Sequence, residues 1–271
     1  MKPGLALAAG AVLAAAILLI VVACARGEAG ATRATRAGST PATGTETLAA
    51  AAAPPGSEAH GHDEAAHGDH ATVHHAFNDP ERWAKIFDDP SRAAWQKPDE
   101  VVAALGLKAG MTAADLGAGT GYFTAALSHA VGEKGVVLSI DPEPEMVQYL
   151  GQRAHREGLA NVVPVLALFE DPFLPPGRVD RVLIVDTYHH IDDRQAYFRR
   201  VGANLAPGGR VAIVDFHKRP LPVGPPPEAK LEREVVVAEM QQAGFRLAAE
   251  PAFLPYQYFL IFETNATGAS Q

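Results

Sequence analysis

The sequence predicts an α/β fold: a doubly wound, seven-stranded, mainly parallel sheet with a C-terminal antiparallel hairpin, preceded by a disordered tether. Three observations predict this fold. Short apolar runs alternate with amphipathic stretches from Met111 onward, which is the pattern of repeated βα units. The last two apolar runs have no room for a helix between them, which indicates a hairpin. Tryptophan, tyrosine and phenylalanine begin only at Phe77, so the folded domain is expected to start there.

The composition limits the possible functions. The chain has 271 residues, of which 48% are hydrophobic and 20% charged, and it contains one cysteine. These values suit one sizeable core and exclude collagen, a coiled coil and a disulfide scaffold. The 23 basic and 31 acidic residues give a net charge of −8, which disfavours binding to a phosphate backbone. We therefore expect a small-molecule partner and no nucleic acid.

Residues 1–23 are expected to form a signal peptide or a membrane anchor. No charged residue lies between Gly4 and Ala25, and the apolar run ends at Cys24, the only cysteine. The residues Val21-Val22-Ala23-Cys24 resemble the bacterial lipobox, in which the signal is cut before a cysteine that receives lipid. This resemblance implies an exported lipoprotein that is anchored to the membrane.

An uncleaved anchor with a cytosol-facing enzyme is the alternative. The apolar run approaches the roughly 20 residues that span a bilayer. Lys2 precedes the run, whereas Arg26, Arg33 and Arg36 follow it. By the positive-inside tendency, this imbalance would keep the C-terminal side in the cytosol.

Residues 24–76 are expected to form a low-complexity tether. Alanine, threonine, glycine and proline dominate, so the segment cannot bury enough apolar surface to offset the entropy of ordering. Histidines interleaved with carboxylates can bind zinc, copper or nickel. Because they have no fixed ligand spacing, weak incidental affinity is favoured over a dedicated metal site. The histidines of this segment are His60, His62, His67, His70, His74 and His75.

Residues 77–271 have the length of one α/β domain. Trp83, Ile86 and Phe87 have helical spacing, and a second helix is predicted from Asp99 to Leu105. Further helices are predicted after Gly121, Glu143, Asp192 and Pro227. The predicted parallel strands are 112–116, 136–141, 162–166, 179–186 and 210–215, and the hairpin strands are 245–250 and 256–262.

A glycine-rich loop follows the first predicted strand. Asp115 is followed by Gly117, Gly119 and Gly121, and then by a helical segment. Glycines let a backbone turn sharply and approach a ligand closely, and the following helix presents free N–H groups. Asp141 lies at the end of the second strand, where a carboxylate can accept hydrogen bonds from ribose hydroxyls. The pattern predicts a nucleoside-binding site.

The segment Asp-Leu-Gly-Ala-Gly-Thr-Gly, the strand-terminal Asp141 and the closing hairpin resemble a class I S-adenosylmethionine-dependent methyltransferase. The resemblance covers Thr112 to about Phe262, and the turn 206–210 and the helix ending 240–245 also match. It implies methyl transfer from S-adenosylmethionine to an unidentified small-molecule acceptor. The residues that it implies for the cofactor are Asp115, Gly117, Gly119 and Gly121 at the methionine part, Asp141 at the ribose, and Ile140 and Pro142 at the adenine.

One segment departs from the family pattern. Many relatives carry an aspartate after the third strand that contacts the adenine amine, often within Gly-Asp-Ala, but residues 166–171 read Leu-Ala-Leu-Phe-Glu-Asp here. Either Glu170 or Asp171 substitutes from a shifted loop, or a backbone group does.

The fourth strand ends in a polar cluster that is expected to face the transferable methyl group. Asp186 could orient His189 or His190 as a general base; alternatively, one histidine is packed and the other exposed. Residues 215–219 close the fifth strand and also reach this edge, where a solvated loop is favoured over contact with an acidic substrate. The first two helices, with Trp83 and Trp95, are expected to cover the cofactor.

Two other functions are alternatives to a methyltransferase. A membrane-tethered metal-binding or interaction protein could keep the fold without the chemistry, since S-adenosylmethionine is scarce outside the cytosol. An NAD-dependent oxidoreductase is disfavoured by the terminal hairpin and by the G-x-G-x-G spacing, because dinucleotide folds prefer G-x-G-x-x-G.

Overall fold

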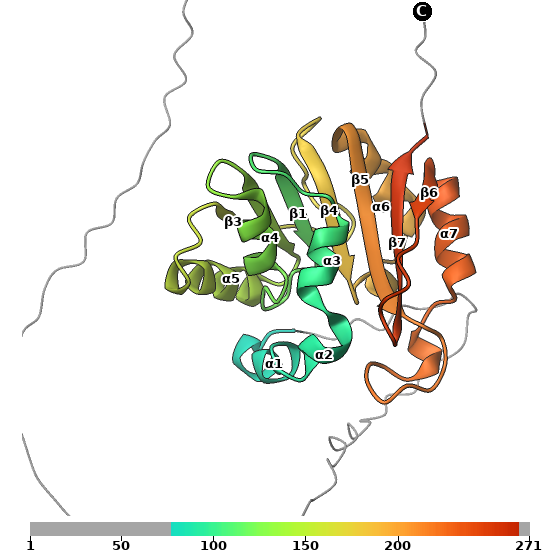
Figure 1. The fold of residues 1–271 in the computed structure, drawn as a ribbon, viewed down its shortest axis with the longest axis horizontal. Coiled ribbons are helices and arrows are strands. Elements are labelled where there is room, and N and C mark those ends of the chain that lie inside the picture. The colour runs from blue at the N-terminus through green and yellow to red at the C-terminus, as the bar shows by residue number, and fades with distance from the viewer. Residues whose placement is uncertain (1–76, 266–271) are drawn as a thin grey trace, which may run out of the picture. The chain divides into compact units, whose positions relative to one another are not determined.

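The computed structural model describes residues 77–265, which contain one seven-stranded sheet in the order β3-β2-β1-β4-β5-β7-β6 (Figure 1). The predicted signal segment with Cys24, the tether, and its histidines His60, His62, His67 and His70 lie outside the described residues. Among residues 77–265, no helix is long and apolar enough to span a membrane.

The strands confirm the predicted fold class. β1 pairs in parallel with β2 and β4, β2 with β3, and β4 with β5, whereas β7 is antiparallel to both β5 and β6. Chain order and sheet order diverge at β1, because β2 lies on one side of it and β4 on the other. Ligands bind at such a switch point, beyond the carboxyl ends of the strands. The strands are β1 (Thr112–Leu116), β2 (Val136–Asp141), β3 (Val162–Leu166), β4 (Val179–Val185), β5 (Leu205–Phe216), β6 (Phe245–Ala249) and β7 (Gln257–Thr264).

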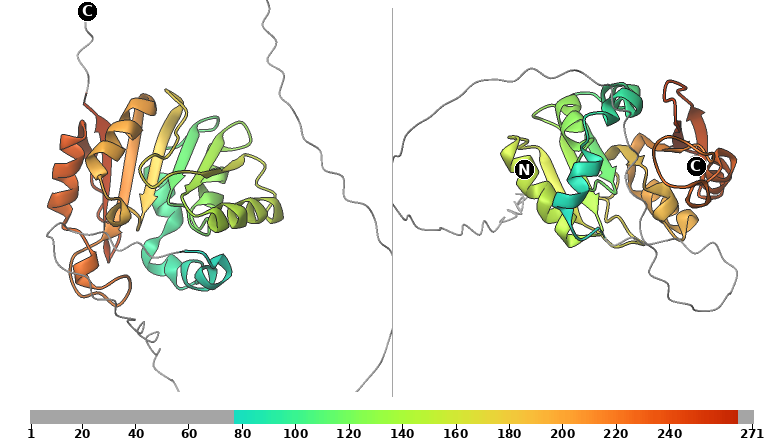
Figure 2. Two further views of the ribbon diagram at one scale, coloured as in Figure 1. Left: turned by 180° about the vertical axis from the view of Figure 1, so that it is seen from behind. Right: turned by 90° about the horizontal axis from the view of Figure 1, so that it is seen from below.

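Helices cover both faces of the sheet (Figures 1 and 2). Side chains of α3, α4 and α5 pack in the core of one face, and those of α6 and α7 in the core of the other. The described helices are α1 (Pro80–Phe87), α2 (Arg92–Gln96), α3 (Pro98–Ala104), α4 (Thr124–Val131), α5 (Pro144–Arg156), α6 (Arg194–Asn204) and α7 (Arg233–Gln242), with 3-10 turns η1 (Tyr188–His190) and η2 (Pro227–Ala229).

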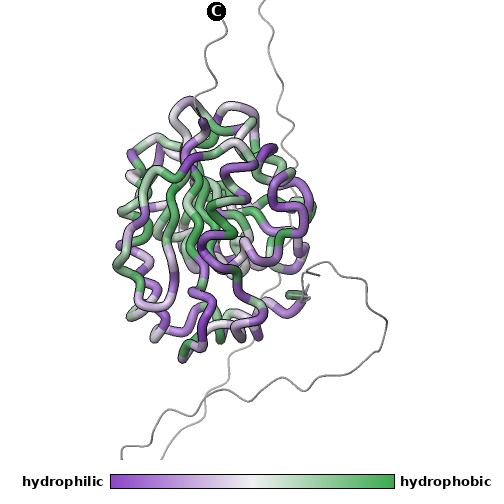
Figure 3. Tube along the Cα trace, turned by 90° about the vertical axis from the view of Figure 1, so that its right-hand side faces the viewer, coloured by the Kyte–Doolittle hydropathy of each residue, from purple (hydrophilic) through white to green (hydrophobic). Residues whose placement is uncertain are grey.

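The central strands are largely hydrophobic (Figure 3). Their side chains contribute to a core on each face of the sheet, as a sheet covered by two helical layers requires. In β5, Val211 and Ile213 face the core of α6 and α7, and Ala212 and Val214 face the core of α3 and α4. Because successive side chains of a strand point to opposite faces, Asp215 at the end of β5 lies on the α6 and α7 face.

Three elements differ from the prediction by more than two residues: α2, β5, and α7, which begins at Arg233 rather than directly after Pro227. The five-residue helix α2 was not predicted, because it is too short to show a hydrophobic period. β5 begins at Leu205 rather than Arg210, since Leu205 pairs with Val179 before the register shifts across the Pro-Gly-Gly turn. Helices α1 and α2 and the connector 217–232 gather at the carboxyl ends of the parallel strands (Figure 1). This end of the sheet holds the polar groups described next.

Candidate functional site

Two backbone hydrogen bonds connect the glycine loop between β1 and α4 to the end of β2. The N–H groups of Gly117 and Ala118 donate to the carbonyl of Ile140 at 2.9 and 3.0 Å. Gly117 has a φ of +69°, and a Cβ there would lie 2.3 Å from Cγ2 of Thr187 in the loop after β4. Glycine at this position therefore permits both the left-handed backbone and the close approach of two strand ends.

Replacing Gly117 with alanine is expected to lower the free energy of unfolding by about 2–5 kcal/mol, from left-handed backbone strain together with overpacking against Thr187. Gly158 is the matched control, because its φ is also +69° but a Cβ there meets nothing within 4 Å. Gly158→Ala should cost only the backbone term, about 1–2 kcal/mol. Denaturant unfolding measures both variants, and equal losses would show that the contact with Thr187 is easily relieved.

Two buried carboxylates flank the glycine loop. Asp141, 6% exposed, accepts hydrogen bonds from Gly119 N–H at 2.8 Å and from Glu143 N–H at 3.0 Å. Asp115, 3% exposed, accepts one from the Thr124 hydroxyl at 2.9 Å. The structure thus brings together the predicted loop residues and both predicted carboxylates.

The charges of these carboxylates are not neutralised by the described part of the protein. Burial raises the pKa of Asp115 to about 7, with Asp141 nearby adding to the shift, and burial raises the pKa of Asp141 to about 6. No lysine, arginine or histidine among residues 77–265 forms an ion pair with either group. A ligand with a positive charge and hydroxyl donors would stabilise both as carboxylates, since each can accept further hydrogen bonds.

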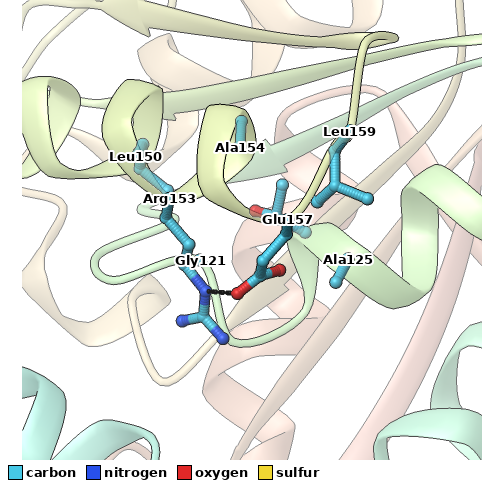
Figure 4. A pocket seen from close by; sticks show the side chains of 8 residues that line it. Gly121, Ala125, Leu150, Arg153, Ala154, Glu157 and Leu159 are labelled. Carbon is cyan, nitrogen blue, oxygen red and sulfur yellow. Dashed lines mark hydrogen bonds and ion pairs between the residues drawn. The ribbon is translucent and has the colours of Figure 1, made fainter.

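Side-chain hydrogen bonds to Asp88 hold helix α1 against the glycine loop. The Thr120 hydroxyl donates to Asp88 at the end of α1 at 3.0 Å, and Arg153 of α5 donates to the other Asp88 oxygen at 2.9 Å. Arg153 also bonds to Glu157, one turn further along α5, beside Gly121 (Figure 4). Phe87 comes within 3.7 Å of the position of a Cβ on Gly119, so its ring covers the loop.

Trp83 and Trp95, which were both predicted to cover the cofactor, pack against different strand ends and loops. Trp83 stacks on Phe87, with ring centroids 5.2 Å apart, and therefore belongs to the aromatic cover above the glycine loop. Trp95 packs instead against Phe216 and Tyr256, at the ends of β5 and β7.

Asp186 does not orient either histidine, and that part of the prediction is wrong. Its carboxylate accepts hydrogen bonds from Gln257 at 2.6 Å, Gln96 at 3.0 Å and Arg92 at 3.3 Å. Asp186 directly follows β4 and has a φ of +54°, which is uncommon outside glycine. Burial raises its pKa to about 6, although the charge of Arg92 acts in the opposite direction. Asp186 thereby ties helix α2 to the strand ends.

The partner of His189 is Asp215. Nδ1 of His189 lies 2.8 Å from Oδ2 of Asp215, whose side chain is fully buried. Burial alone lowers the pKa of His189, but the charge and hydrogen bond of Asp215 outweigh it, so this pKa is raised. The expectation that residues 215–219 form only a solvated loop is wrong for Asp215, because β5 extends to Phe216 and carries Asp215 into the interior. His190 packs beside His189, with ring centroids 4.2 Å apart, and edge-on to Phe77.

The sequence did not indicate the roles of four site residues. Asp215 had a usable signal, since it is an acidic residue at the carboxyl end of a predicted parallel strand. Arg92, Gln96 and Gln257 had none, because the unpredicted helix α2 and the final strand meet at Asp186 only in three dimensions.

The residues expected at the adenine offer fewer polar groups than those expected at the methionine part and the ribose. Ile140 is 2% exposed and packs in the core, so it contributes its carbonyl to the glycine loop, while Pro142 is half-buried. Asp171 accepts a hydrogen bond from Phe173 N–H, and Glu170 is exposed. An adenine contact by either acidic residue stays a prediction. Among residues 77–265, no group of three or more potential ligands could hold a metal ion.

Comparison with known families decides between the nucleoside-binding folds. The family described as a methyltransferase domain matches residues 107–250, more than half of the chain. The chain belongs to this methyltransferase family. A solved S-adenosylmethionine-dependent methyltransferase from Aquifex aeolicus is 32% identical, with a TM-score of 0.65 over 68% of this chain and 97% of that one. S-adenosylmethionine is therefore the cofactor of this methyltransferase domain.

Two further relatives show how far the similarity extends. The ubiquinone/menaquinone biosynthesis C-methyltransferase UbiE of Shewanella sp. (strain ANA-3) is 33% identical over 114 residues, which are 42% of this chain and 45% of that protein. The methyltransferase chain thus spans less than half of the length of this curated relative. Magnesium protoporphyrin IX methyltransferase from Synechocystis PCC 6803, solved with bound S-adenosylmethionine, is 20% identical with a TM-score of 0.53, which shows the fold alone.

Proposed function

We propose that this methyltransferase transfers a methyl group from S-adenosylmethionine to a small-molecule acceptor, with His189 as the general base. The observation that carries the proposal is the buried His189–Asp215 pair at the carboxyl ends of β4 and β5. His189 lies two residues after Thr187, which lies against Gly117 of the glycine loop. Sheets of this topology bind their ligands at this edge.

The residues around the glycine loop suit this cofactor. S-adenosylmethionine, when bound, supplies an electrophilic methyl group on a positively charged sulfur. We assign Asp115 and the loop glycines to its methionine part and Asp141 to its ribose, and Ile140 and Pro142 to the adenine side. The support is physical: two buried carboxylates without a cation in the described residues match a cationic ligand with hydroxyl donors.

Asp215 prepares His189 to accept a proton. A carboxylate at Nδ1 favours the tautomer that carries its hydrogen on Nδ1, which leaves a lone pair on Nε2. With the cofactor bound, Nε2 would take the proton that the acceptor's oxygen, nitrogen or activated carbon loses on methylation, while the carbon–sulfur bond would break and leave its electron pair on the cofactor's sulfur. The raised pKa makes His189 a stronger base than a free imidazole.

The relatives favour a small organic acceptor. UbiE is named as a C-methyltransferase of ubiquinone and menaquinone biosynthesis, and its matched region includes less than half of that protein. Incubating the full-length chain with tritium-labelled S-adenosylmethionine and a small-molecule cell extract tests the proposal. Label should pass to an extracted organic compound in wild type, and a protein that binds the cofactor but labels nothing would favour an inactive fold.

Cofactor affinity is expected to fall as the pH is lowered from 7.5 to 5.5. The free protein's Asp141 and Asp115, with pKa values of about 6 and 7, take up protons in this range, whereas the bound cofactor needs both as carboxylates. Binding should therefore release protons, and the affinity should drop by up to about tenfold per pH unit for each group that must ionise. Calorimetry at three pH values, in two buffers of different ionisation heat, measures both effects. Proton uptake on binding would contradict the assignment.

A further inference from the structure

The methionine part of S-adenosylmethionine carries a carboxylate as well as an ammonium group. The buried carboxylates Asp115 and Asp141 suit the ammonium group, the positive sulfur and the ribose hydroxyls, but they repel a further carboxylate. Neither forms an ion pair with a lysine, arginine or histidine among residues 77–265. The carboxylate of the cofactor therefore needs a cation from another element near the glycine loop.

Two arginines reach the glycine loop, and one of them already has strong partners. Arg153 donates to the Thr120 carbonyl at 2.9 Å. It also pairs with Asp88 at 2.9 Å and with Glu157 at 2.8 Å. Two carboxylates at these distances more than balance the charge of one guanidinium. Arg153 therefore offers no excess positive charge to the cofactor.

The other arginine, Arg92 of α2, lies between aromatic rings beside the same loop. Its Cζ is 4.6 Å from the ring centroid of Tyr122, which directly follows Gly121, and 5.9 Å from that of Phe87. The Phe87 ring in turn lies 3.7 Å from the position of a Cβ on Gly119. Contact with two rings restricts the guanidinium, and its N–H donors can still bind a carboxylate.

The guanidinium of Arg92 has a long ion pair and spare donors. Its carboxylate partner among the described residues is Asp186 at 3.3 Å, whereas strong pairs of this kind have N–O distances of about 2.7–2.9 Å. The Phe87 carbonyl and Gln96 accept two further N–H groups. Because arginine has five N–H donors, two have no partner within residues 77–265. The side chain is 14% exposed, so a carboxylate that bound it would be largely shielded from water.

We propose that Arg92 binds the carboxylate of the methionine part of S-adenosylmethionine, in competition with Asp186. The inference rests on the cofactor of the proposed function and does not depend on the acceptor or on His189. It gives helix α2 a role in cofactor binding, because the bound carboxylate would hold Arg92, and with it α2, against the glycine loop. It also makes the site selective for ligands with an intact amino acid part.

Calorimetric titration of the full-length protein at pH 7.5 tests this with S-adenosylhomocysteine and with its decarboxylated analogue, S-adenosyl-3-thiopropylamine. The two probes differ only in the carboxylate, and neither carries a transferable methyl group. Wild type should bind S-adenosylhomocysteine about 10–100-fold more tightly than the analogue, since the analogue cannot make the charged hydrogen bond to Arg92. Arg92→Gln should bind S-adenosylhomocysteine about 10–100-fold more weakly than wild type does, and the analogue equally well.

Asp186→Asn separates carboxylate recognition from a purely structural role of the Arg92–Asp186 pair. If Asp186 competes with the cofactor for Arg92, this variant should favour S-adenosylhomocysteine over the analogue about three- to tenfold more than wild type does. If the pair only holds α2 in place, Arg92→Gln and Asp186→Asn should weaken both probes alike. Arg82→Gln is the matched control, because Arg82 is an exposed arginine on the neighbouring helix α1, and it should bind both probes as wild type does.

Equal affinities of wild type for the two probes, or the wild-type ratio of affinities in Arg92→Gln, would overturn the carboxylate site. If Arg92→Gln binds neither probe because it does not fold, Asp186→Asn decides, and an unchanged ratio in that variant overturns the proposal. A wild-type protein that binds neither probe would overturn the cofactor assignment of the proposed function as well.

Discussion

Replacing His189 with glutamine is expected to lower kcat for methyl transfer by about 10²–10⁴-fold, with the affinity for S-adenosylmethionine unchanged. His189 is the imidazole that a fully buried carboxylate orients at the carboxyl ends of β4 and β5, so its loss removes the proton acceptor without altering the glycine loop. Asp215→Asn should also lower kcat, because an amide can donate to Nδ1 and then favours the wrong tautomer.

The pKa of His189 gives a readout that does not need the acceptor. NMR titration of the histidine ring should place it above 6.5 in wild type and lower in Asp215→Asn, since the negative charge that stabilises the imidazolium is removed. His129→Gln is the control, because His129 is exposed near the end of α4. An unchanged kcat in His189→Gln, or an unchanged His189 pKa in Asp215→Asn, would assign the pair a structural role.

The fold could be predicted because its signals are local. Each parallel strand is a short apolar run, the glycine loop follows β1 directly, and the first three strands were predicted with the bounds that the structure has. β5 was predicted too short, since Leu205 joins it only by pairing with Val179 across an irregular turn. That pairing is a tertiary event that no local pattern reports.

For the site residues too, local patterns predicted the contacts between consecutive βα units, but they did not predict the contacts that depend on tertiary packing. Asp141 and the loop glycines are close in space because consecutive βα units bring them together, so their chain order already indicates proximity. The choice between Asp186 and Asp215 as partner of His189 depends on which face each side chain occupies and on what else competes for it. Arg92 and Gln96 reach Asp186 from α2, about 90 residues earlier in the chain, and leave His189 to Asp215.

Asp141→Ala is expected to weaken S-adenosylmethionine binding by about 1.5–3 kcal/mol, which is roughly 10–150-fold in Kd. Asp141 already accepts the N–H of Gly119, so its loss removes both the charged acceptor for the ribose and one support of the loop. Asp141→Asn keeps the shape and one acceptor oxygen but no charge, and should fall between wild type and Asp141→Ala. Calorimetric titration of the full-length protein measures all three.

Glu145→Ala is the matched control for Asp141→Ala. Glu145 is an acidic residue four positions later, exposed in the first turn of α5, so its removal changes the net charge equally without touching the loop. Thermal unfolding of each variant without cofactor shows whether the loop has collapsed. A folded Asp141→Ala protein with the wild-type Kd would remove Asp141 from the cofactor site, and an equal loss in Glu145→Ala would attribute the effect to overall charge. Weak binding in Asp141→Ala alone, with intermediate binding in Asp141→Asn, is the result that a charged ribose acceptor requires.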